Sequence, residues 1–103
     1  MNAMPLSGKQ ARHLRALAHH LDPVVILGTC GISDAVVKKI VVELENHELI
    51  KVKVAENAGL SAKEAAPVLE ERTGGQVAQV IGRIVVLYKR RAEEPTIVLP
   101  AAT

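Results

Sequence analysis

The chain has 103 residues, 49% of them hydrophobic, and a formal net charge of +2. That length suits one compact domain with a modest core and is too short for two. With one tyrosine and no phenylalanine or tryptophan, the composition excludes an aromatic platform for stacking bases.

A single cysteine excludes an internal disulfide and a cysteine-rich zinc site, and it fits a cytoplasmic protein. The sequence contains no pattern typical of a secretory signal and no apolar run of about 18 residues, so we expect no membrane span. We expect a single domain over residues 1–103, with a core at about 5–90 and a tail at 91–103.

A basic amphipathic helix is predicted near the start of the chain. Ser7 and Gln10 match a capping box, and apolar residues then recur at helical spacing as far as Leu21. Asp22 and Pro23 are expected to end the helix. Its opposite side carries Lys9, Arg12, His13, Arg15, His19 and His20.

A glycine loop follows, and we predict the working site there. The apolar, largely β-branched run 24–27 stops at Gly28, and Gly28, Thr29, Cys30 and Gly31 lead into Ser33 and a second helical pattern. A strand, a tight loop and a capped helix would leave backbone amides and the positive end of the helix dipole free for a phosphate. The alternative is an ordinary turn that binds nothing.

The second helix is expected to end at Asn46 and His47. Residues 49–55 then alternate, with Ile50, Val52 and Val54 on one face and Lys51 and Lys53 on the other. This pattern predicts a half-buried strand with a cationic exposed face.

A loop at 56–60 leads to a third helix, where Ser61 and Glu64 form a second capping box. Arg72 lies in the last turn, and Gly74 and Gly75 end the helix. A proline beyond the first turn of a helix removes a backbone donor, so Pro67 leaves two possibilities: a helix that begins near Ser61, or one that begins later with Pro67 in its first turn.

Two strands at 76–81 and 84–89 flank Gly82 and Arg83, as expected for a hairpin with a type II′ turn. Residues 96–99 form a possible short edge strand. The order helix, strand, helix, strand, helix, strand, strand predicts an α/β sandwich with a mixed sheet.

The basic residues form two acid-free blocks, at 1–21 and at 83–91. One patch built from both would suit a polyanion, whereas two separate solvated faces would not. The second block contains Arg83, Lys89, Arg90 and Arg91.

Local spacing suggests no catalytic site, metal site or cofactor site. Cys30 at a helix start could be an activated thiol, but no histidine or second cysteine lies near it in sequence. The four histidines lack metal-ligand spacing, and residues 28–31 lack the length and the Gly-Lys-Ser/Thr of a phosphate-binding P-loop.

Three segments together resemble the CRM domain family, named for chloroplast RNA splicing and ribosome maturation, and most closely its bacterial YhbY-type stand-alone form. They are LGTCGIS at 27–33, HELIKVKV at 47–54 and VIGRIVVLYKR at 80–90. The resemblance covers roughly residues 5–99. It implies a two-layer sandwich with a four-stranded mixed sheet and three helices, like the C-terminal domain of translation initiation factor three.

The resemblance also implies a non-enzymatic RNA-binding protein of large ribosomal subunit assembly, with precursor ribosomal RNA as partner. A KH-like clamp loop at 28–31 would hold RNA backbone. We expect a monomer with no small-molecule substrate and no membrane partner. Flanking contacts would come from Lys9, Arg12, Arg15, Lys38, Lys39, Arg83, Lys89 and Arg90.

In many members of this family a lysine lies between the two glycines, where this chain has Thr29 and Cys30. Affinity would therefore depend more on the lysines and arginines of the first two helices. An alternative function is a protein-interaction module, in which Lys51 and Lys53 dock an acidic partner on the ribosome. A thiol enzyme acting through Cys30 is a third possibility.

Overall fold

The computed structural model describes residues 5–101; the other six residues of the predicted domain lie outside the described residues. The elements follow the predicted order, with a short 3-10 helix, η1, in the predicted loop at 56–60. They are α1 (Gly8–Ala18), β1 (Pro23–Leu27), α2 (Asp34–His47), β2 (Leu49–Val54), η1 (Glu56–Ala58), α3 (Ala62–Thr73), β3 (Gln76–Ile81) and β4 (Ile84–Tyr88).

The four strands form one mixed sheet in the order β1-β2-β4-β3. β1 and β2 are parallel, and the other neighbours are antiparallel. In the β3–β4 hairpin Ile81 pairs with Ile84, and Gly82 has a φ of 55° while Arg83 does not enter the left-handed region. A positive φ at the first turn residue alone is what the predicted type II′ turn requires.

Strand directions bring three connections together at one end of the sheet, which we call the loop end. It holds residues 28–31, which follow β1, then η1, which follows β2, and the Gly82–Arg83 turn. The Val54 amide donates to the Arg83 carbonyl at 2.7 Å, and the Ala55 amide donates to the Leu27 carbonyl at 3.0 Å. The opposite end, where β2 begins and β4 ends, is the tail end.

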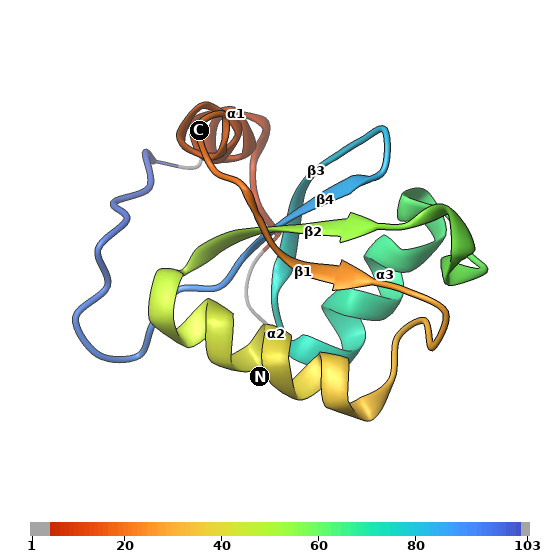
Figure 1. Cartoon of the computed structure of the whole chain (residues 1–103). Helices are drawn as coiled ribbons and strands as arrows, with labels where there is room; N and C mark the ends of the chain where they lie inside the picture. Colours follow the sequence, from red (N-terminus) through yellow and green to blue (C-terminus); the bar gives the residue numbers. More distant parts are fainter. Residues whose placement is uncertain (1–4, 102–103) are drawn as a thin grey trace.

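α2 and α3 pack side by side on one face of the sheet, and α1 lies on the other (Figure 1). The larger core is formed by Val25 and Leu27 of β1, by alternate residues of β2 and β4, and by α2 and α3. The predicted sandwich is therefore the sheet with α2 and α3. α1 adds a short cover on the opposite face.

α1 begins with the predicted capping box, in which Ser7 Oγ accepts from the Gln10 amide at 3.1 Å. It ends at Ala18, so the prediction that it continues to Leu21 was wrong. Leu14 and Ala18 are buried against the tail end of the sheet, whereas Leu17 is 43% exposed. The apolar spacing continued beyond Ala18, but Leu17 and Leu21 stay 43% and 37% exposed, so their packing does not hold another turn.

α3 is continuous through Pro67, so a later helix start is also excluded. Ser61 caps it with the predicted box to Glu64. Pro67 cannot donate to the carbonyl of Lys63, one turn earlier. Because Pro67 and Lys63 both lie on the exposed side of α3, water can satisfy that carbonyl.

Residues 96–99 do not form the possible edge strand. The tail instead crosses the tail end of the sheet, where Ile97 and Leu99 pack beside α1 and Tyr88. Its anchor is Glu48, a fully buried carboxylate that follows α2 with a φ of 62°. Part of the predicted tail is thus fixed to the core by contacts distant in sequence.

Candidate nucleic-acid interface

The glycine loop is a tight turn with an open tip. The Gly31 amide donates to the Gly28 carbonyl at 2.9 Å, and Gly31 has a φ of 58° that favours glycine. Thr29 and Cys30 are both exposed at the tip. Within residues 5–101, their amides have no hydrogen-bond acceptor. The turn therefore presents free backbone donors to solvent.

Gly28 keeps the approach to this turn clear. A Cβ atom built at Gly28 would meet nothing within 4 Å, and its φ lies outside the left-handed region. At Gly31 a Cβ would lie 3.6 Å from the Ala58 carbonyl oxygen of η1. That distance is an ordinary contact, so it is the positive φ that favours glycine at position 31, whereas the free space at position 28 is available to a ligand.

α2 starts directly behind the turn. Ser33 caps it as predicted, because its Oγ accepts from the Val36 amide at 3.2 Å. The helix runs for 14 residues, so the positive end of its dipole faces the loop. Lys38 and Lys39 are exposed on the same helix, about one turn or 6 Å further along. They are the predicted cations that lie nearest to the loop in sequence.

Arg72 of α3 reaches this helix start, and sequence reasoning missed it. Its guanidinium donates to the Ile32 carbonyl at 2.7 Å and forms an ion pair with Asp34. Asp34 is 91% exposed at the first position of α2, where a carboxylate is favourable to the helix but repels an incoming phosphate. No local pattern could have paired residues 38 positions apart.

A second arginine at the loop end is also paired. Arg83, one of the predicted contacts, lies 3.3 Å from Glu56 of η1. Arg72 and Arg83 are thus both held in ion pairs, so anion binding at this end rests on the backbone amides, the α2 dipole and the exposed lysines.

The remaining predicted cations lie elsewhere. Lys89 and Arg90 follow β4 at the tail end. The Lys89 ammonium lies beside Gly74, the C-cap of α3, since a Cβ atom built at Gly74 would be 3.2 Å from it. Arg91 is occupied, since its guanidinium donates to the carbonyls of residues 45, 46 and 94. The acid-free block at 83–91 is therefore split by the length of β4, about 17 Å.

Lys9, Arg12 and Arg15 lie on α1, on the opposite face of the sheet from α2 and α3. The structure therefore does not unite the two basic blocks around the glycine loop. The split of the second block could have been predicted from the hairpin, because Arg83 lies in the turn and Lys89 follows the second strand. The position of α1 depends on packing that no local pattern reveals.

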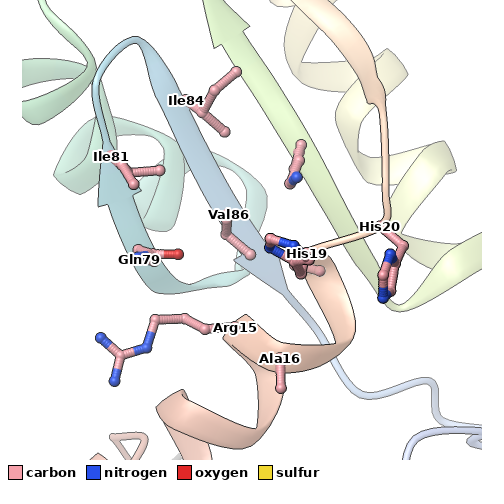
Figure 2. A pocket seen from close by; sticks show the side chains of 10 residues that line it. Arg15, Ala16, His19, His20, Gln79, Ile81, Ile84 and Val86 are labelled. Carbon is pink, nitrogen blue, oxygen red and sulfur yellow. The ribbon is translucent and has the colours of Figure 1, made fainter.

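A groove of about 630 Å³ lies between α1 and the sheet. Figure 2 shows its apolar floor. Ile81 and Ile84 lie at the end far from Arg15, and Val86 lies between these isoleucines and Arg15. Its basic lining consists of Arg15, His19, His20 and Lys51. Sequence analysis identified the cationic strand face that contributes Lys51 but did not place α1 beside it.

Within residues 5–101 no cluster of three or more histidine, cysteine, aspartate or glutamate residues could hold a metal ion. In the same part of the chain, no helix is long and apolar enough to cross a membrane. Cys30 is a free, exposed thiol.

Comparison with known proteins agrees with this fold. The chain is 42% identical over 95 residues to "Probable RNA-binding protein YqeI" of Bacillus subtilis, covering 92% of this chain and 99% of that protein. It is 47% identical over 97 residues to an "RNA-binding protein" of Haemophilus influenzae, covering 92% and 95% of the two chains.

A similar solved structure is the solution structure of the hypothetical protein SAV1595 from Staphylococcus aureus. It has a TM-score of 0.75 and 42% sequence identity, and the match covers 92% of this chain and 99% of that one. Residues 6–89 match the family described as the CRS1 / YhbY (CRM) domain. The chain belongs to this family, which confirms the resemblance found in the three sequence segments.

Proposed function

We propose that this protein binds RNA and that the glycine loop at 28–31 grips the RNA backbone. The observation that carries the proposal is the open tip of the loop, with free amides at Thr29 and Cys30 directly before the start of α2. Backbone amides and a helix N-terminus bind phosphate oxygens without regard to base identity. The Thr29 hydroxyl adds a further donor.

Two relatives that match over nearly their whole length carry RNA binding in their names, which supports RNA as the partner. The same names describe binding proteins and no catalytic activity, so we propose a non-enzymatic role. Lys38 and Lys39 would contact neighbouring phosphates, because they lie one turn along α2 from the loop.

We further propose that the RNA is a precursor of the large ribosomal subunit and that the protein acts during its assembly in the cytoplasm. This finer proposal rests on the family to which the chain belongs. A backbone grip of low base specificity suits a factor that holds a folding RNA in one arrangement while other parts assemble.

Ultraviolet crosslinking in growing cells, followed by sequencing of the attached RNA, tests both levels of the proposal. We expect crosslinks concentrated in ribosomal RNA precursors of the large subunit. A protein carrying Gly28→Asp, expressed at the same level, is the matched control and should lose them. Crosslinks spread evenly over cellular RNA would refute the ribosomal role, and an absence of crosslinks would refute RNA binding.

A further inference from the structure

Charge is distributed unequally between the two faces of the sheet. α1 and the four strands contain five lysines and arginines and no carboxylate. α2 and α3, on the other face, contain four lysines and arginines and six carboxylates. Although the formal net charge of the whole chain is only +2, one face is strongly cationic.

The groove beside α1 lies within this cationic face. Every titratable side chain that lines it is basic, and within residues 5–101 neither Arg15 nor Lys51 takes part in an ion pair. The positive charges of this groove are thus uncompensated, in contrast to Arg72 and Arg83 at the loop end, which are paired with Asp34 and Glu56.

The sheet face remains open from this groove toward the glycine loop. α1 packs against Leu49, Val86 and Tyr88, and beyond it Ile81 is 58% exposed on β3 while Ile26 is 61% exposed on β1. Lys53 pairs with Ile26 and with Ile84 across the sheet, so it lies in the same open area as these isoleucines. A path of apolar surface with two lysines therefore leads from α1 to the end that carries the loop.

We propose that this groove and the open sheet face form a second RNA contact, along which the strand held by the glycine loop continues toward α1. Arg15 and Lys51 would contact phosphates on the two sides of the groove, and the apolar floor at Ile81, Ile84 and Val86 would contact sugars and bases (Figure 2). The inference rests on the proposed function, and it assigns most of the electrostatic attraction to the α1 face.

An RNA strand fits this surface better than an acidic protein does. The cations border a flat apolar floor that leads to the free amides of the loop, and a nucleic acid strand presents phosphates and apolar base faces along its whole length. His19 and His20, whose ring centroids are 5.1 Å apart in an edge-to-face arrangement, border the groove and add ring N–H donors for phosphate or base edges.

The test measures the salt dependence of binding. A fluorescein-labelled single-stranded RNA of mixed sequence is titrated by anisotropy at several KCl concentrations with the wild type and with the double variant Arg15→Gln, Lys51→Gln. Each lost phosphate contact lowers the slope of log affinity against log salt by about 0.7, so we expect the slope to fall by about 1.4. Affinity at low salt should fall roughly tenfold.

Lys63→Gln is the matched control, because Lys63 is an exposed lysine on α3, across the sheet from the groove. It should leave the slope unchanged. The thermal unfolding curve of each variant is recorded to check the fold, and glutamine keeps most of the aliphatic stem that lines the groove.

The groove contact would be overturned if the double variant kept the wild-type slope and affinity. If Gly28→Asp at the same time lost binding, the proposed function would remain intact. Failure of the wild type to bind any RNA at low salt would overturn the proposed function itself. If poly-glutamate binds as tightly as the RNA and loses as much in the double variant, the groove is a dock for acidic proteins, and the inference fails.

Discussion

Glu48 and Thr96, 48 residues apart, are joined by two hydrogen bonds to one carboxylate oxygen. Glu48 Oε1 accepts from the Thr96 amide at 2.6 Å and from its hydroxyl at 2.7 Å, and it also accepts from the Ile97 amide. Oε2 accepts from the Arg91 amide at 2.9 Å. A single buried carboxylate thus fixes the C-terminal segment against the tail end of the sheet.

These bonds determine how stability depends on pH. Burial alone would raise the pKa of Glu48, but the donors from Arg91, Thr96 and Ile97 outweigh it and lower the pKa to about 2. Since the unfolded value is 4.5, the carboxylate stabilises the fold fully above pH 4.5. We expect this contribution to disappear as the pH falls from 4.5 to about 2.

Glu48→Gln removes the charge from this site and should lower the free energy of unfolding by about 1–3 kcal/mol at pH 7. Urea denaturation at pH 7 and at pH 3 measures this loss of unfolding free energy. Glu45→Gln, which changes an exposed neighbour, is the control. The difference between wild type and Glu48→Gln should shrink at pH 3. A constant difference would show that the ionised carboxylate is not the anchor.

Gly28→Asp should abolish RNA binding while the protein stays folded. The carboxylate would occupy the space in front of the free amides and repel phosphate, whereas no neighbouring atom opposes a side chain there. Anisotropy titration and a thermal unfolding curve measure the two effects. Lys63→Asp places the same side chain on the exposed side of α3, away from α1, and should bind like the wild type.

Cys30 allows the loop to be blocked without a mutation, because it is the only cysteine in the chain and is exposed. Alkylation with N-ethylmaleimide places a bulky group at the loop tip and should weaken RNA binding roughly tenfold or more, as expected for loss of a charge-assisted phosphate contact. Cys30→Ser should bind normally and be insensitive to the reagent. Full binding by the alkylated wild type would place the RNA elsewhere.

Asp34→Asn should change stability and affinity in opposite directions. The helix loses a favourable charge at its first position and the partner of Arg72, which lowers the free energy of unfolding by about 0.3–1 kcal/mol. RNA affinity should rise several-fold, because a negative charge leaves the phosphate site. Glu45→Gln removes a charge near the other end of α2 and should not raise affinity.

Pro67→Ala should stabilise the protein by about 1–3 kcal/mol, since alanine restores a donor to the Lys63 carbonyl within α3. Thermal denaturation measures the gain, and Val68→Ala at the next exposed position serves as control. An unchanged melting temperature would mean that solvation of that carbonyl fully replaces the missing hydrogen bond.

Local features of the fold were predictable where a few neighbouring residues determine them. The capping boxes at Ser7 and Ser61 and the turn at Gly82 formed as predicted, because each depends on residues at most three positions apart. The end of α1 was not predictable in this way. Leu17 and Leu21 continue the helical spacing, but only tertiary packing determines which of these side chains is covered.

The candidate site also combines features that neighbouring residues determine with features that depend on tertiary contacts. The glycine loop and the cap at Ser33 follow from one short segment, and the structure places them together as expected. The ion pairs of Arg72 and Arg83 and the position of α1 depend on contacts between distant elements. The layout of charge along the chain indicated that basic residues gather in blocks, but the sheet determines which of these cations share a face.

The unequal charge of the two sheet faces has a kinetic consequence. A molecule with its positive charge on one side has a large electric dipole moment, and the field of a nucleic acid rotates such a molecule before contact. Productive collisions would then begin at the α1 side, and docking of the loop would follow. The association rate constant should therefore decrease with ionic strength more steeply than the formal net charge alone predicts.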